Sequence, residues 1–180
     1  MDEAALIRAA LDCGADGAEL VPGTRLVTSD SLRRFCEDNV CGYYGRCWSC
    51  PPDAGEASAL IGELKKYGRV LIYQVISRVC DLSDAEELNA AGARLTEVSQ
   101  RLQDHLRSVP DGEFLHLGGV CRLCPECARI KNEPCRYPER LIPSLSAYCV
   151  DVRKTCEGTS LEYTNGENTV TNFGMVLFNE

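Results

Sequence analysis

Apolar residues recur every three or four positions in three stretches of the chain, and this spacing predicts three amphipathic helices. The stretches cover residues 2–12, 56–67 and 84–107. Gly14 and Gly68 follow the first two stretches, as glycine commonly does at the end of a helix. Ser83 and Glu86 have the spacing of a capping box at the start of the third stretch.

Extended structure is predicted where apolar and β-branched residues run together. Residues 70–76 form an almost unbroken apolar run, which is typical of a central strand covered on both faces. We expect shorter strands at residues 18–21, 25–28, 114–117, 161–164 and 170–178, and short helices at 31–37 and 144–156. This order of elements predicts one layered α/β or α+β domain over residues 1–180, in which helices flank a central mixed sheet. Two cysteine-rich loops, at about 36–52 and 118–143, emerge from it.

Twelve cysteines stand out in a chain of 180 residues that carries a net charge of −8. The negative charge disfavours nucleic acid, whose phosphates it would repel. No stretch approaches the roughly 20 apolar residues that cross a bilayer, and the first residues lack the basic and apolar regions of a secretory signal. We therefore expect a cytoplasmic protein that binds neither nucleic acid nor membrane, and whose thiols serve metal or redox chemistry. The alternative is a secreted disulfide scaffold whose signal peptide has been removed.

The strongest motif is Cys121-x2-Cys124-x2-Cys127, followed by Cys135 in the segment Glu-Pro-Cys-Arg-Tyr-Pro. Cysteines this close cannot easily pair as disulfides, because so tight a loop strains the bond geometry. The spacing is typical of a [4Fe–4S] cluster, which is held by a C-x2-C-x2-C run and a more distant cysteine beside a proline. Zinc ribbons use two separated C-x2-C pairs, a pattern that this sequence lacks. The sequence therefore favours an iron–sulfur site and leaves zinc as the alternative.

The other cysteine-rich loop contains Cys36, Cys41, Cys47 and Cys50, and Pro51 follows the last of these. The density of thiols, with glycines that allow tight bends, again indicates metal ligands. A Cys-Pro junction in ferredoxins can belong to a cysteine that ligates a cluster other than that of its neighbours. Cys50 could therefore bind locally or complete the Cys121 site. Cys47-x2-Cys50 has chelating spacing, so Cys47 is either a further ligand or a packed thiol.

Three sequence blocks resemble a family of predicted metal-binding proteins of unassigned function that is frequent in anaerobes. They are C-x4-C-G-x-Y-G-x-x-W-x-C-P-P from Cys36, C-x2-C-x2-C-A with a following P-C-R-x-P from Cys121, and P-S-L-S-A-Y-C-V-D-V from Pro143. The resemblance covers about residues 30–178 and implies metal binding through Cys36, Cys41 and Cys50, and through Cys121, Cys124, Cys127 and Cys135. Two departures stand out: Cys47 is an extra thiol, and Cys149 stands where the family usually has glycine.

Other candidates have simpler interpretations. Cys149 and Cys156 fall on an apolar helical stripe and are expected to be packed in the core. Cys13 ends a predicted helix and Cys80 ends a predicted strand, so both are expected to be structural. His116 lies on the strand that leads to the C-x2-C-x2-C run. We expect it to be hydrogen-bonded, with a role as ligand or proton donor as the alternative.

Three functions follow from these expectations. The first is an iron–sulfur redox protein with one or two [4Fe–4S] clusters, the second on Cys36, Cys41 and Cys50, which delivers electrons to a partner protein. The second is an enzyme in which a cluster held by three cysteines has an open iron that acts as a Lewis acid on a small-molecule substrate. The third is a zinc-stabilised interaction module. The sequence does not determine whether the protein is an enzyme, and its oligomeric state is open.

Overall fold

The computed structural model describes residues 3–108 and 113–179, and its centre is a four-stranded sheet in the order β1-β2-β4-β3. The strands are β1 (Gly17–Pro22), β2 (Arg69–Arg78), β3 (Phe114–Leu117) and β4 (Thr169–Phe178). Each neighbouring pair is antiparallel, and β2 and β4 are paired along ten residues. The α+β class is confirmed, but the sheet is not mixed: strands that are neighbours in the sheet alternate in direction, and β4 lies between β2 and β3, which run the same way.

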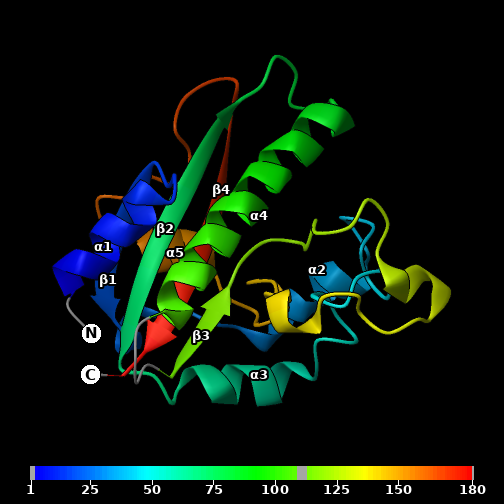
Figure 1. Ribbon diagram of the computed structural model, residues 1–180, viewed down its shortest axis with the longest axis horizontal. Helices are drawn as coiled ribbons and strands as arrows, with labels where there is room; N and C mark the ends of the chain where they lie inside the picture. The colour runs from blue at the N-terminus through cyan, green and yellow to red at the C-terminus, as the bar shows by residue number, and fades with distance from the viewer. Residues whose placement is uncertain (1–2, 109–112, 180) are drawn as a thin grey trace.

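Helices cover both faces of this sheet (Figure 1). The helices are α1 (Glu3–Asp12), α2 (Arg33–Glu37), α3 (Ala57–Leu64), α4 (Ala85–Arg107) and α5 (Val152–Cys156). One face packs against α1 and α4, and the other packs against α3, α5 and the chain between residues 144 and 161. The predicted helices at 2–12, 56–67 and 84–107 are therefore found, with the first observed from Glu3 because residues 1–2 lie outside the described chain.

Strand β2 shows why one apolar run can serve two cores. Val70 and Ile72 face the α3 side, whereas Leu71, Tyr73 and Val75 face α1 and α4. All five are fully buried. Alternate residues of a strand point to opposite faces, so a strand covered on both sides needs apolar residues at successive positions. The prediction of a doubly covered central strand at 70–76 is confirmed.

Several local predictions were wrong for identifiable reasons. Residues 25–28 and 161–164 are not strands, although Thr28 forms an isolated bridge with Val150. Asp84 rather than Ser83 caps α4, because its carboxylate accepts hydrogen bonds from the first free backbone N–H groups of the helix. The helix predicted from 144 to 156 is reduced to α5, because Cys149 has a left-handed backbone, with φ of 53°, that a helix cannot include.

The two cysteine-rich loops lie beside the β3 edge of the sheet (Figure 1). Gly118 leaves β3 and forms a parallel bridge with Ser144, so the second loop begins and ends at neighbouring points. The loops themselves contain little regular structure, chiefly α2 and short 3₁₀ turns at Ala128–Lys131 and Pro138–Arg140. Within the described residues, none of the helices has the length and apolar character needed to span a membrane.

Candidate metal centre

The four cysteines of the strongest motif lie around one small cavity. Cys121, Cys124, Cys127 and Cys135 all line it, together with Trp48 of the other cysteine loop. Each of the four is partly buried and has a free thiol. The chain between the third and fourth cysteines turns back through the 3₁₀ turn at Ala128–Lys131, which brings the distant cysteine to the same cavity. The sequence spacing therefore corresponds to a spatial group.

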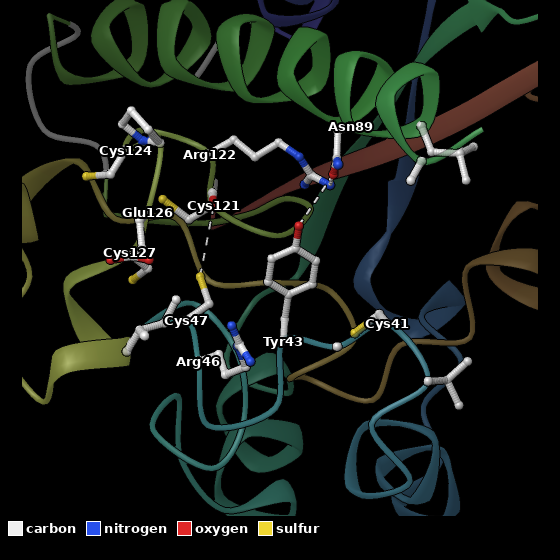
Figure 2. A pocket seen from close by; sticks show the side chains of 16 residues that line it. Cys41, Tyr43, Arg46, Cys47, Asn89, Cys121, Arg122, Cys124, Glu126 and Cys127 are labelled. Atoms are coloured by element: carbon white, nitrogen blue, oxygen red, sulfur yellow. Dashed lines mark hydrogen bonds between the residues drawn. The ribbon is translucent and has the colours of Figure 1, made fainter. Parts of the chain in front are cut away.

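Cys47 of the first loop lies against this group, and Cys50 lies beside Cys47. The sulfur of Cys47 lies 4.0 Å from the carbonyl oxygen of Cys121 (Figure 2). It is also hydrogen-bonded to the thiols of Cys50 and Cys127. Cys47 and Cys50 are both buried, with exposed fractions of 1% and 4%. The two loops thus bring their thiols together at one place, which sequence spacing alone did not determine.

Ser49 connects the two loops through hydrogen bonds, a role that the sequence did not predict. Its hydroxyl accepts a hydrogen bond of 3.0 Å from the backbone N–H of Cys121 and lies 3.3 Å from the sulfur of Cys47. Its carbonyl accepts a 2.9 Å hydrogen bond from the N–H of Ser144. The residue is fully buried. A serine between two cysteines carries no distinctive signal, so only its position shows that three segments depend on it.

Trp48 and the arginines of the second loop form a cover over the thiols. The indole N–H of Trp48 donates to the carbonyl of Glu133 at 3.1 Å, and the guanidinium of Arg129 lies over its ring at 5.4 Å from the centroid. Arg129 also pairs with Asp53 at 2.7 Å, which ties the second loop to the first. Arg136 is hydrogen-bonded to the thiol of Cys124, and this contact raises the pKa of its guanidinium.

The thiols differ in how readily they ionise. The thiol of Cys50 and the hydroxyl and N–H of Ser49 donate to Cys47, and together they lower its pKa from 9.0 to about 5 against the effect of burial. The hydrogen bond between Cys50 and Cys47, together with burial, raises the pKa of Cys50. Burial raises the pKa of Cys121 to about 11 when no metal is present. A raised pKa favours the protonated thiol, but a bound metal ion favours the thiolate, because the thiolate is the form that it binds.

Cys36 and Cys41 belong to a different neighbourhood. Burial raises the pKa of Cys36, and the charges of Cys41 and Cys149 raise it further, so each of these two thiols lies near Cys36. Cys41 lies at the far end of the cleft from Cys47 (Figure 2). A site that combines Cys36, Cys41 and Cys50 therefore stays a prediction, while the structure places Cys50 beside Cys47.

Cys149 is buried, as expected, but it is not on a helix. Its left-handed backbone is a conformation that glycine adopts without strain, which is the physical reason that glycine suits this position. Cys156 is buried at the end of α5, and burial raises its pKa to about 11. Cys13 and Cys80 are free thiols outside both loops, Cys13 partly buried and Cys80 exposed, and a structural role for them stays a prediction.

His116 is hydrogen-bonded inside the body of the protein. Its Nε2 lies 2.7 Å from the hydroxyl of Tyr73, which in turn lies 2.7 Å from the hydroxyl of Ser99. Complete burial lowers the pKa of His116 to about 3, since the charged ring would lose its hydration. The expectation of a hydrogen-bonded histidine is confirmed.

A wide cleft of about 750 Å³ opens beside the thiols (Figure 2). Cys47, Cys121, Cys124 and Cys127 lie at one end of it. Arg46, Arg122, Glu126, Tyr43 and Asn89 also line it, together with apolar side chains from both loops and α4. A cleft of this size accommodates a small molecule. The thiols are therefore accessible from one side and covered by Trp48 on the other.

The side chains of the four motif cysteines offer thiols alone as metal donors. In the parts of the chain that the structure describes, no three His, Cys, Asp or Glu side chains are grouped so that they could hold one metal ion. Zinc ions and iron–sulfur clusters are both held by cysteine thiolates, so this donor set is compatible with either.

Comparison with known families decides the classification. The family described as "Predicted metal-binding protein (DUF2284)" matches residues 19–178. The chain belongs to this family. Neither the curated proteins nor the solved structures include a significant match. Membership therefore supports metal binding as the general function, and the residues and the kind of metal must be argued from the site.

Proposed function

We propose that this DUF2284 protein is an iron–sulfur redox protein with a [4Fe–4S] cluster on Cys121, Cys124, Cys127 and Cys135. The observation that carries the proposal is that all four thiols of the motif line one cavity. The donors are thiols alone, the ligand chemistry that such clusters use. The cluster, when bound, supplies one-electron redox chemistry, and the chain delivers those electrons to a partner protein.

The surroundings of the four cysteines support a redox role. Thiolates around a cluster carry net negative charge, and Arg136 and Arg129 place positive charge beside them. Hydrogen bonds to the sulfur atoms and exclusion of water tune the reduction potential of such sites. Arg136 contributes a hydrogen bond to Cys124, and Trp48 contributes an apolar cover.

The test is metal analysis of Cys124→Ser with a matched thiol control. Anaerobically purified protein is expected to contain iron and acid-labile sulfide, and Cys124→Ser is expected to lose at least one cluster, about four irons per chain, because a cube needs its thiolates. The control is Cys80→Ser, an exposed thiol outside both loops, which is expected to keep its iron. Unchanged iron in Cys124→Ser contradicts the proposal. A zinc-containing, iron-free preparation favours the interaction module instead.

Iron content also tests the second predicted cluster. Eight irons per chain support a further cluster that involves Cys36, Cys41 and Cys50, whereas four irons leave those thiols outside cluster binding. Cys36→Ser is the informative variant, because Cys36 lies near Cys41 and Cys149 rather than in the cavity of the main group.

A catalytic function is the second candidate, and the wide cleft favours it. Cys121, Cys124 and Cys127 line this cleft as well as the smaller cavity, so a small molecule in the cleft would lie next to a metal bound by these cysteines. An iron without a protein thiolate would act there as a Lewis acid. The count of ligands separates the two candidates: if Cys135→Ser keeps an intact cluster with altered spin-resonance spectra, three cysteines suffice and the catalytic function is favoured.

A further inference from the structure

The cleft beside the cysteines contains two positive charges that lack an acidic partner. Six basic residues occur in the loops at 36–52 and 118–143. Arg129, Lys131, Arg136 and Arg140 each pair with a carboxylate. Among the described residues, Arg46 and Arg122 form no such ion pair, and both line the cleft. Glu126 also lines the cleft, but its carboxylate pairs with Lys131, so both arginines stay available to a ligand.

Contacts with two neighbouring side chains and the backbone hold the guanidinium of Arg122 in place. Its guanidinium donates to the side-chain oxygen of Asn89 at 3.1 Å and to the carbonyl of Val120 at 3.2 Å, and it lies over the ring of Tyr43 at 5.6 Å from the centroid. It also packs against Gly92 of α4, where a Cβ atom would come within 2.6 Å of the guanidinium carbon. These contacts use two of its five N–H groups and leave others free to bind a ligand.

Arg122 does not serve the thiols directly. Arg136 is the cation that is hydrogen-bonded to a cysteine of the motif. The side chain of Arg122 instead extends along α4 toward Asn89, away from the sulfur atoms (Figure 2). Arg136 therefore offsets the charge of the thiolates, whereas Arg122 is directed to the open part of the cleft.

The rest of the lining indicates an organic molecule rather than an inorganic ion. Val40, Leu88 and Ile130 line the cleft and keep exposed fractions of 77%, 37% and 40%. Exposed apolar side chains that surround a cavity are typical of ligand sites. A planar guanidinium with free N–H groups matches a carboxylate, which it can bind through two parallel hydrogen bonds.

We propose that this cleft binds a small organic carboxylate, with Arg122 as its anchor, Arg46 as a second cation and the apolar rim around its carbon chain. Binding of the carboxylate does not depend on the proposed metal centre. Only a role of the carboxylate as a substrate rests on that proposal. The carbon chain of the bound molecule would lie in the same cleft as Cys47 and Cys121, so the anion-binding arginines and the motif cysteines line one cavity.

The test is calorimetric titration of the anaerobically purified protein with succinate, with neutral succinamide and inorganic sulfate as matched probes. Saturable binding of succinate, with much weaker binding of the other two, is expected. Arg122→Gln is expected to weaken succinate binding by at least about tenfold, since a charge-assisted pair of hydrogen bonds is lost. Arg101→Gln, a surface cation of α4 paired with Glu97, is the control and is expected to bind as the wild type does.

Gly92→Ala provides a variant that keeps every charge. Alanine favours the helix by about 1 kcal/mol, so folding is retained while the new methyl group displaces the guanidinium. Weakened succinate binding with unchanged iron supports the proposal. Three results overturn it: no saturable succinate binding, equal binding of succinate and succinamide, or unchanged affinity in both Arg122→Gln and Gly92→Ala. Iron content is read separately, so binding by a protein without iron refutes the proposed function and leaves this inference standing.

Discussion

The sheet body and the cysteine loops are stabilised by different forces. The body consists of the four strands with α1, α3 and α4, and its two cores contain almost entirely apolar side chains. The loops at 36–52 and 118–143 are linked instead by polar contacts, chiefly those of Ser49, Trp48 and the Arg129–Asp53 pair. We therefore expect the sheet body to be stabilised chiefly by hydrophobic burial, and the loops to gain stability when a metal binds their thiols.

Metal removal should affect the two regions very unequally. We expect the protein stripped by a chelator to keep the sheet body, because none of its core residues belongs to the loops at 36–52 and 118–143. We expect it to lose order in the loops, because structural metal binding supplies folding energy. Limited proteolysis measures this: cleavage should move to residues 36–52 and 118–143 and accelerate by about tenfold or more, as expected for a local opening worth at least 1.4 kcal/mol. Loss of the far-ultraviolet circular dichroism of the whole chain would contradict the comparison.

The body should be the region that senses mild acid through His116. Its pKa is about 3 when folded and 6.5 in the reference state, so below pH 6.5 the unfolded chain binds a proton that the folded chain does not. Stability should therefore fall as pH decreases, by about 1.6 kcal/mol between pH 6.5 and 5, with a slope that approaches 1.4 kcal/mol per unit. Urea denaturation at several pH values measures the slope. His116→Gln should flatten it, whereas the exposed His105→Gln should not.

The contact between the two regions should depend on Ser49. Ser49→Ala leaves the N–H of Cys121 without its hydrogen bond and removes a donor to Cys47. We expect a loss of about 1–3 kcal/mol, because a buried polar group is left unpaired. The measurement is unfolding of the metal-bound protein, with iron retention as a second readout. Ser83→Ala, in an exposed turn, is the matched control and should change stability by less than about 0.5 kcal/mol.

Sequence patterns predicted the body better than the site. The segments that form β2, β4 and α4 are long, and their hydrophobic pattern alone predicts them. The existence and approximate limits of these elements were confirmed. The grouping of Cys121, Cys124, Cys127 and Cys135 followed from local spacing. The position of Cys47 and Cys50 against that group, and of Cys149 near Cys36, depends on how three loops meet in space. Irregular loops carry no periodic signal, so such contacts are invisible in the sequence.

Cys149 offers the finest distinction between a packed thiol and a metal ligand. Its φ of 53° is strained for any residue with a Cβ atom. Cys149→Ala keeps that strain and removes the thiol, whereas Cys149→Gly removes both, so their difference isolates the backbone. We expect Gly to be more stable than Ala by about 0.5–1 kcal/mol, contrary to the usual preference for alanine. Denaturant unfolding of the two variants measures this difference.

The same two variants also report on the chemistry around Cys36. If Cys149 only packs in the core, both variants keep the iron of the wild type and differ only in stability. If its thiol belongs to a second site with Cys36 and Cys41, both lose the same amount of metal although their stabilities differ. Equal metal loss at unequal stability cannot arise from unfolding, so this pair separates a ligand from a structural thiol where a single substitution would not.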